Sequence, residues 1–321
     1  MTGLRVSVAV STYQRASILP RLFAALAAQT LDADEFEVVI ADDGSADDTP
    51  AVLEHLVAAA PFAARVVTAP TNRGPAAGRN LAWRAGTAPV VAFTDDDCQP
   101  APGWLAAGLA ALGDRARVVI GRTTPRDEDA QLASQPFSRT MRVDSVRFFE
   151  TCNVFYRRAD LERSGGFDET FPMAAGEDTD LGLRVRNSGV EPVFAPEAVV
   201  YHDVRPGNFR TTLRDTWRWV DIPLVIRLHP EERRSLLHRR FFWKGSHPPV
   251  IAAIAGVALL RVRPAAAALL LLPWLHYRLR VAPPCPGPRR RWLALPGAFV
   301  VDGLEVIVMV RGSVRHRVVV L

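Results

Sequence analysis

The sequence predicts an α/β protein in which a mainly parallel sheet is flanked by helices and followed by a helical C-terminal extension. Two observations support the sheet. Short apolar runs alternate with amphipathic stretches of about ten to twelve residues through residues 1–125. Polar clusters follow several of these runs, as ligand-binding residues do at the strand ends of parallel sheets. A third observation supports the extension, because residues 206–321 combine long apolar runs with many arginines.

The alternation assigns strands and helices in a regular order. Strands are expected at 5–10, 37–41, 65–68, 90–94 and 117–120, and helices at 18–28, 49–60, 76–86 and 104–112. Later strands are expected in NVFYRR and VEPVFAPEAVVY, with a helix after Gly176 between them. Residues 122–147 are polar and weakly periodic, which predicts a mobile loop or short helices near the substrate. Strands joined by crossover helices pair in parallel and are covered by helices.

The net charge of +5 combines two halves of opposite sign. Residues 1–204 hold 19 arginines and 28 acidic residues, a net of −9, whereas residues 205–321 hold 20 basic and 6 acidic residues, a net of +14. The acidic half indicates a cation site, and the basic half indicates an anionic membrane or nucleic acid. The three scattered cysteines favour a reducing compartment, and the short apolar stretch at the N-terminus does not resemble a signal peptide.

Three adjacent carboxylates, Asp95, Asp96 and Asp97, end the strand expected at 90–94. Their mutual repulsion is unfavourable unless a cation offsets it. Mg²⁺ and Mn²⁺ prefer carboxylate ligands, and Mg²⁺ commonly bridges them to substrate phosphates. The stretch TNRGPAAGRN adds Arg73 and Arg79 to the same edge. The edge is therefore expected to bind a metal and a phosphorylated ligand, with a solvated turn as the alternative.

Three more polar groups lie where ligands are expected. Asp42 and Asp43 either accept a hydrogen bond from a nucleobase N–H or form an ordinary turn. Glu177 and Asp178 begin a predicted helix, where one acts as a general base or both complement the helix dipole. His202 follows a strand and is either a metal ligand or an ordinary histidine.

Six ordered motifs resemble the family-2 glycosyltransferases with the GT-A fold: VSVAVSTYQR, VVIADDGSADDT, NRGPAAGRN, FTDDDCQP, NVFYRRADLERSGGFDE and GEDTDLGLR. The resemblance covers about residues 5–205. It implies that Ser11 and Asp42 contact the base of a sugar nucleotide and that Arg79 lies near the base or phosphate. The expected donor-binding residues are Ser11, Tyr13, Asp42, Asp43, Arg79, Asp95 and Asp96.

The resemblance also implies a metal site and a base. Asp95 and Asp97 occupy the first and last positions of the family's D-x-D motif, with Asp97 as the direct ligand of Mg²⁺ or Mn²⁺ and His202 as a further ligand. Asp178, with Glu177 beside it, matches the catalytic base. The expected reaction is metal-dependent and inverting: an acceptor hydroxyl displaces a nucleoside diphosphate.

One departure predicts transfer of a single sugar. Processive members of the family carry Q-x-x-R-W after the base, whereas DTWRW has Asp215 where the Gln would be, with only Arg218 and Trp219 in register. A plain amphipathic helix packed by its tryptophans is the alternative interpretation of this segment.

The chain is expected to divide into a catalytic domain, 1–205, and a helical region, 206–321. The apolar runs 249–260 and 264–275 are shorter than the about 20 residues that cross a bilayer, and residues 293–310 predict another apolar helix. Flanking aromatic residues and arginines favour an interfacial anchor at an anionic cytoplasmic leaflet over core helices or a re-entrant hairpin. The expected location is the cytoplasmic face of the membrane, peripheral or shallowly inserted, with a soluble cytoplasmic protein as the alternative. The acceptor would then be lipid-linked or a cell-envelope glycan.

Other functions have weaker support. A sugar-phosphate nucleotidyltransferase usually has a glycine-rich loop after the first strand, and VSTYQRAS has no glycine. A noncatalytic nucleotide-sugar-binding protein would not need both Asp97 and Asp178. Nucleic acid is not expected as a partner, because aliphatic runs stand where base-stacking platforms would be needed. Dinucleotide and P-loop fingerprints are absent from the sequence.

Overall fold

The computed structural model describes residues 3–113, 116–189, 191–282 and 288–321. The chain forms two compact units. The first contains Met1–Asp127 and Thr140–Asp203, and the second contains Glu128–Arg139 and Val204–Leu321. Each unit has buried apolar residues of its own.

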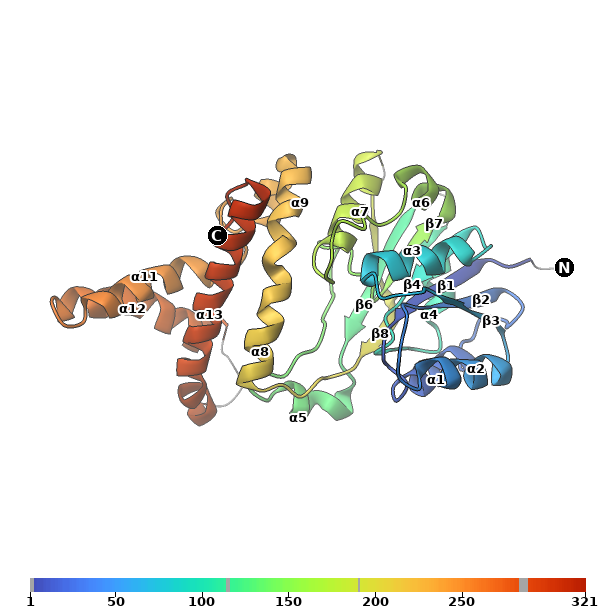
Figure 1. The fold of residues 1–321 in the computed structure, drawn as a ribbon, viewed down its shortest axis with the longest axis horizontal. Helices are drawn as coiled ribbons and strands as arrows, with labels where there is room; N and C mark the ends of the chain where they lie inside the picture. Colours follow the sequence, from blue (N-terminus) through green and yellow to red (C-terminus); the bar gives the residue numbers. More distant parts are fainter. Residues whose placement is uncertain (1–2, 114–115, 190, 283–287) are drawn as a thin grey trace. The chain divides into compact units, whose positions relative to one another are not determined.

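The first unit is built on a sheet of strands in the order β3-β2-β1-β4-β7-β6-β8-β5 (Figure 1). The strands are β1 Val6–Thr12, β2 Phe36–Asp42, β3 Ala63–Thr68, β4 Val90–Phe93, β5 Cys98–Pro100, β6 Val118–Thr124, β7 Val154–Arg157 and β8 Val193–His202. The pairs β1–β2, β1–β4, β2–β3 and β6–β8 are parallel, and the other three pairs are antiparallel. The predicted α/β class and mainly parallel sheet are confirmed.

Helices cover both faces of this sheet. They are α1 Leu19–Ala27, α2 Thr49–Ala59, α3 Pro75–Ala85, α4 Trp104–Leu112, α6 Arg158–Ser164 and α7 Glu177–Asn187. Consecutive strand residues point to opposite faces. Phe155 packs on Trp104 of α4 with ring centroids 5.2 Å apart, while Tyr156 packs on Phe93, whose other neighbour is Phe167. The two faces therefore have separate aromatic cores.

The register of the sheet brings the predicted site residues together. Thr12 pairs with Asp42 at the ends of β1 and β2, and Ala9 pairs with Phe93 near the end of β4. Residues that follow these strands therefore lie at one edge. The short strand β5, which the sequence pattern did not predict, pairs Cys98 with His202 of β8 in antiparallel register. This pairing places the histidine beside the end of the aspartate cluster.

The second unit is helical, apart from short turns. Its helices are α5 Ala130–Ala133, α8 Phe209–Thr216, α9 Ile222–Leu228, α10 Arg233–Leu236, α11 His247–Leu259, α12 Pro264–His276 and α13 Pro288–His316. A 3-10 turn spans Asp127–Asp129, others span Trp217–Asp221 and Pro230–Glu232, and a π-turn spans Tyr277–Val281. Residues 122–147, expected to be a loop or short helices, contain the end of β6, the first of these turns and α5.

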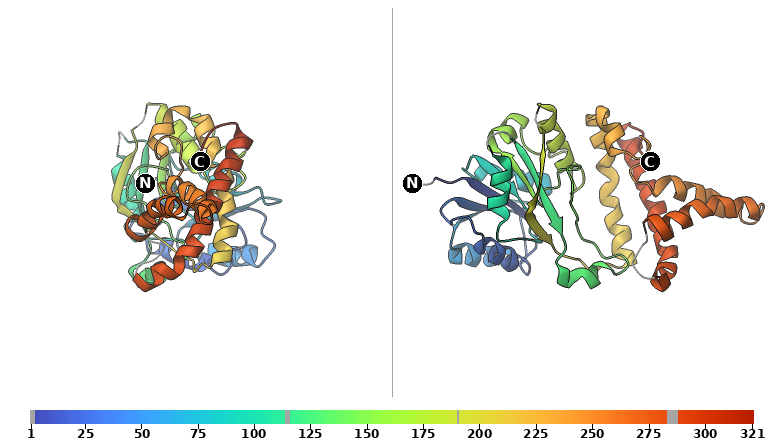
Figure 2. Two further views of the ribbon diagram at one scale, coloured as in Figure 1. Left: turned by 90° about the vertical axis from the view of Figure 1, so that its left-hand side faces the viewer. Right: turned by 180° about the vertical axis from the view of Figure 1, so that it is seen from behind.

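Two antiparallel helices, α11 and α12, form a hairpin that packs on α13 through its base (Figure 2). Gly256 allows the two helices to approach, because a Cβ there would lie 2.9 Å from the carbonyl oxygen of Ala267. At the base of the hairpin, fully buried Asp302 of α13 accepts hydrogen bonds from Trp274 at 2.8 Å and from Arg278. These bonds offset the cost of burying a carboxylate.

One helix of the described residues, Arg291–His316, is long and apolar enough to cross a membrane by length and composition. Within its most apolar window, 39% of the residues are buried inside the protein. The segments 249–260 and 264–275, expected to be apolar helices, correspond to α11 and α12. Both are shorter than a bilayer-spanning helix.

Candidate active site

Two aspartates at the end of β2 have different partners. Asp43 accepts backbone N–H groups of Arg73 and Gly74 at 2.8–3.1 Å, and so fixes the loop before α3. Asp42 is 1% exposed and accepts the N–H of Ser45 through Oδ1. Its Oδ2 is buried and has no hydrogen-bond partner among the described residues. A buried carboxylate oxygen without a donor is unfavourable, and an N–H group of a bound molecule would offset this cost.

The loop after β1 lies against the same edge. Ser11 contacts α3 so closely that a Cβ at Gly78 would overlap its Oγ. Tyr13 is 40% exposed and available to stack on a planar ligand. Gln14 has a φ of 54°, and its N–H donates to Ser45 at 2.8 Å. The strained turn therefore joins the ends of β1 and β2.

Arg79 on α3 connects two parts of the site. Its Nη1 donates to Glu177 at 2.6 Å, and its Nη2 donates to Asp95 at 3.0 Å. The guanidinium also lies 5.9 Å from the ring centroid of Phe167. Burial lowers the pKa of Arg79, but the carboxylates of Asp95 and Glu177 outweigh it and raise that pKa above its ordinary value. Arg79 is therefore a permanent cation between the aspartate cluster and the start of α7.

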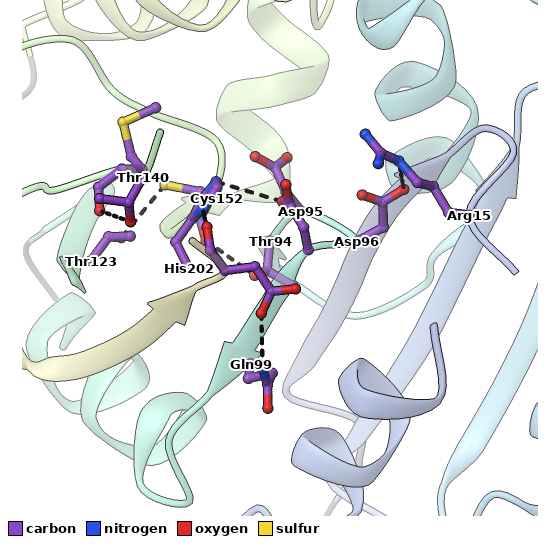
Figure 3. Close-up of polar contacts among 12 residues, drawn as sticks. Arg15, Thr94, Asp95, Asp96, Gln99, Thr123, Thr140, Cys152 and His202 are labelled. Carbon is purple, nitrogen blue, oxygen red and sulfur yellow. Dashed lines mark hydrogen bonds and ion pairs between the residues drawn. The ribbon is translucent and has the colours of Figure 1, made fainter. Parts of the chain in front are cut away.

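Asp96 contacts the end of β1 and the loop that follows it. It accepts a hydrogen bond from Thr12 at 2.8 Å and lies 3.7 Å from the guanidinium of Arg15, as Figure 3 shows for the arginine. Burial and the nearby charge of Asp97 raise the pKa of Asp96 to about 7, against the opposing effects of Arg15 and Thr12. Asp96 therefore anchors the β1 loop, a contact that the sequence pattern did not predict.

Asp97 and His202 are neighbours. Nε2 of His202 lies 3.6 Å from Oδ1 of Asp97, and its Nδ1 lies 2.9 Å from the carbonyl oxygen of Asp203. If Nδ1–H donates to that carbonyl, Nε2 presents a lone pair toward a carboxylate oxygen, an arrangement that a cation between them stabilises. The residues therefore fit a divalent metal.

Cys98 completes a group of three possible ligands whose atoms lie within 4.8 Å of one another. Burial raises the pKa of the Cys98 thiol well above its ordinary value, and the adjacent carboxylates add to the effect. A protonated thiol is a poor ligand, and Mg²⁺ and Mn²⁺ prefer oxygen and nitrogen. Asp97 and His202 are therefore stronger candidates for metal ligands than Cys98. Asp95, at the first position of the D-x-D motif, is a further candidate.

The start of α7 carries the predicted base. Gly176 has a φ of 104°, which glycine adopts without strain, and α7 begins at the next residue. Asp178 accepts the N–H of Thr179 at 2.7 Å. Burial, followed by the charges of Glu177 and Glu150, raises the pKa of Asp178 well above its ordinary value. A carboxylate held this way is a stronger proton acceptor than an exposed aspartate.

Glu150 and Tyr156 were not predicted as site residues. Glu150 contributes to the raised pKa of Asp178, and its buried Oε2 has no partner among the described residues. The hydroxyl of Tyr156 is also buried without a described partner. Burial, and then the charge of Asp178, raises the pKa of Tyr156. Tyr156 lies within the motif NVFYRRADLERSGGFDE, but the motif assigned the tyrosine no role. Glu150 lies outside the six motifs, and the irregular stretch before β7 gives no periodic signal for it.

The site thus combines acidic and cationic side chains at the strand ends of the sheet, where ligands bind in open α/β folds. Comparison with known proteins identifies the family. The family model "Glycosyl transferase family 2" matches residues 7–167, and "Glycosyl transferase family group 2" matches residues 127–280. The chain therefore belongs to glycosyl transferase family 2.

Two curated relatives are glycosyltransferases. Validoxylamine A glucosyltransferase of Streptomyces hygroscopicus subsp. jinggangensis is 29% identical over 228 residues, 60% of this chain and 54% of that protein. Pre-mycofactocin glycosyltransferase of Mycobacterium tuberculosis is 30% identical over 257 residues, 72% of this chain and 50% of that protein. The matched regions thus span about half the length of these relatives.

The fold matches a solved mannosyltransferase from Pyrobaculum calidifontis, in complex with GDP-Man and Mn2+. The TM-score is 0.69 at 23% identity, and the match covers 95% of this chain and 87% of the other. The likeness confirms the predicted GT-A fold.

Proposed function

We propose that the protein transfers one sugar from a nucleoside-diphosphate donor to an acceptor hydroxyl with inversion at the sugar carbon. The observation that carries the proposal is the convergence of three groups at one strand edge. These are the Asp97–His202 pair, the Arg79 bridge and the start of α7. The solved structural neighbour binds GDP-Man, which supports a nucleotide-sugar donor.

The base of the donor would bind at Asp42. Its unpaired Oδ2 suits an N–H of uracil or guanine, since both bases present such a donor. Ser11, near the end of β1, and Tyr13, in the loop after it, would contact the base or ribose. Asp43 would act through the backbone of the loop before α3, whose N–H groups it accepts. Arg79 would lie near the diphosphate.

Asp97, His202 and Asp95 would hold Mg²⁺ or Mn²⁺, in line with the Mn2+ named for the structural neighbour. When bound, such an ion supplies positive charge to the departing diphosphate. The chain's own residues orient these groups. Asp203 fixes the ring of His202 through Nδ1, and Arg79 fixes the carboxylate of Asp95.

Asp178 would remove the proton from the acceptor hydroxyl. The proton moves to a carboxylate oxygen of Asp178 while the hydroxyl oxygen attacks the sugar carbon opposite the departing diphosphate. Glu177 is held by Arg79, and the N–H of Thr179 orients the carboxylate of Asp178. A base with a raised pKa gains more from accepting this proton.

Two features support transfer of a single sugar to an acceptor at a membrane. Asp215, in place of the glutamine of processive relatives, pairs with Arg139 and Arg214. The second unit exposes large apolar side chains on the α11–α12 hairpin. The acceptor would be lipid-linked or a cell-envelope glycan, and the protein would bind the cytoplasmic face of the membrane peripherally or shallowly.

The test uses UDP-, GDP- and dTDP-sugars with Mg²⁺ or Mn²⁺, and measures binding and slow donor hydrolysis. Asp97→Ala should lose metal-dependent binding. Asp178→Asn should keep binding and lose turnover. Asp34→Asn, an exposed acid before β2, is the matched control and should behave as wild type. Failure of every sugar nucleotide to bind with either metal would overturn the proposal.

A further inference from the structure

A pocket of about 460 Å³ lies at the base of the α11–α12 hairpin in the second unit. Arg239, His238, His276 and Tyr277 supply its cationic and polar lining, while Ala252 and Pro273 supply apolar lining. None of the lining residues is acidic. A pocket with this lining is suited to an anion that also carries an apolar part.

The backbone places Arg239 in an unusual conformation. Arg239 and Arg240 have φ angles of 50° and 69°, in a tight turn where glycine or asparagine is usual. The backbones of His238 and Phe242 are bonded to each other in both directions, at 2.8 and 3.0 Å. Arg233 donates to the carbonyl oxygen of Arg240 at 3.1 Å. A strained turn held by its surroundings, with arginines at both strained positions, is typical of a functional site.

The surroundings of the pocket are apolar and cationic. Exposed side chains that continue from it along the hairpin are Ile251, Ile254, Val257, Leu260, Leu269 and Leu272. Residues 233–301 contain 12 lysines and arginines and no aspartate or glutamate, although Lys244 and Arg278 pair with Glu305 and Asp302 of α13. The partner of this surface must therefore combine negative charge with apolar surface, as an anionic lipid leaflet does.

We propose that the pocket binds the phosphate of an anionic membrane lipid, with the α11–α12 hairpin lying in the membrane interface. The guanidinium of Arg239 and the polar groups of His238, His276 and Tyr277 would contact the phosphate oxygens. The acyl chains would lie over Ala252, Pro273 and the exposed apolar side chains beyond them. Arg261 and Arg263 at the hairpin tip would contact neighbouring phosphates. A free phosphate would leave this apolar surface in water, so the lipid is favoured. The proposal rests on the membrane association proposed above.

The test compares Arg239→Gly with Arg240→Gly in the full chain. Each variant removes one positive charge, and each replaces a strained residue with glycine, so both should fold. Only Arg239 lines the pocket. The partition coefficient is measured by flotation with phosphatidylcholine vesicles, with and without phosphatidylglycerol, at physiological ionic strength. Arg240→Gly should weaken anionic binding about fivefold or less. Arg239→Gly should weaken it about tenfold further.

Equal losses in the two variants would overturn the pocket and leave only diffuse attraction. Binding of inorganic phosphate as tight as the binding of phosphatidylglycerol vesicles, in a buffer of matched ionic strength, would overturn the lipid as the source. Val262→Glu, at the hairpin tip, should weaken vesicle binding. Val314→Glu should not, although both valines are 76% exposed. Soluble-donor hydrolysis should be unchanged in Arg239→Gly. Vesicle binding therefore tests the lipid pocket, and donor hydrolysis separately tests the proposed glycosyltransferase activity.

Discussion

Arg79 on α3 donates from Nη1 to Oε1 of Glu177 on α7 across 2.6 Å. Both residues are buried, and the second amino group of the same guanidinium reaches Asp95. One side chain therefore links the D-x-D turn to the helix that carries Asp178. The distance between the proposed metal ligands and the proposed base depends on this link.

Arg79→Lys is expected to impair turnover although it keeps the charge. A lysine cannot span both carboxylates with a planar fork, so Asp95 and Glu177 lose their common partner. We expect kcat to fall about 100-fold and the free energy of unfolding to fall about 2 kcal/mol. Arg84→Lys, an exposed position on the same helix, is the control for both measurements. Wild-type kcat in Arg79→Lys would contradict this role.

Asp42→Asn and Asp43→Asn are expected to fail in different ways. Asn at 42 turns an acceptor toward the ligand N–H into a possible donor, so the dissociation constant for the nucleotide should rise about 10- to 100-fold. Asp43 instead holds the backbone of the loop before α3, so Asp43→Asn should lower stability by about 1–3 kcal/mol. Calorimetric binding and thermal unfolding separate the two effects. The assignment of Asp42 fails if its variant binds nucleotide normally.

Gly78→Ala should weaken donor binding with a small effect on folding. The new methyl group would displace the Oγ of Ser11, which can rotate away from α3 and from the ligand. We expect a loss of affinity of about tenfold, the value of one hydrogen bond. Gly103→Ala is the matched control, because a Cβ there meets nothing within 4 Å. Unchanged affinity in Gly78→Ala would remove Ser11 from the binding site.

Glu150→Gln should move the acidic limb of the pH profile of kcat/KM to lower pH. Burial is the largest cause of the raised pKa of Asp178, but the charges of Glu177 and Glu150 add to it. Asp178 must be ionised to act as a base, so activity falls as pH drops through its raised pKa. Removing the charge of Glu150 lowers that pKa. An unmoved limb would show that Glu150 does not act on the base.

The same variant should change the pH dependence of stability. Burial raises the pKa of Glu150 itself, ahead of its other influences. Its contribution to stability is therefore fully present below its ordinary pKa and is lost as pH rises through the raised value. Glu150→Gln has no ionisable group at this position, so its free energy of unfolding does not fall with rising pH for this reason. Chemical denaturation at several pH values should find the variant's advantage over wild type increasing from acidic to neutral pH.

Asp302→Asn should destabilise the second unit by about 3 kcal/mol, because it leaves the partly buried guanidinium of Arg278 without its charged, fully buried partner. Asp215→Asn, which breaks a part-exposed pair with Arg139, should lower stability by less than about 1 kcal/mol. Thermal unfolding of the two variants tests the difference. Equal effects would mean that the Asp302 bonds are not a principal support of the hairpin base.

The elements of the parallel half of the sheet were predictable from local patterns. Each predicted strand and helix from β1 to α4 lies within two residues of its observed bounds, because one run of apolar residues determines each element. The strand β5 is too short to produce such a pattern, and it is defined by its pairing with β8. The extension of β6 to Thr124 depends likewise on a partner distant in sequence.

The candidate site was predictable where a motif follows a strand or begins a helix. Asp42, Asp95, Asp97 and Asp178 stand in such motifs, and their roles remain predictions. The motifs did not predict that Arg79 joins two carboxylates or that Asp96 contacts Arg15, because both contacts require the folded arrangement of separate elements. Glu150 lies in an irregular stretch, and only its burial distinguishes it from other acidic residues there.

The segment Glu128–Arg139 belongs to the second unit although it precedes β7 and β8 in the chain. Its Phe137 packs on Phe209 with ring centroids 5.9 Å apart, and the backbone of Arg139 pairs with that of Arg205. A ribosome therefore releases this segment well before its partners. Phe137 therefore lacks its packing partner during synthesis until β8 and the start of α8 have been added to the chain. A chain truncated after β8 would lack Phe209 and leave Phe137 without its packing partner. A single truncation therefore does not separate the first unit from all of the second.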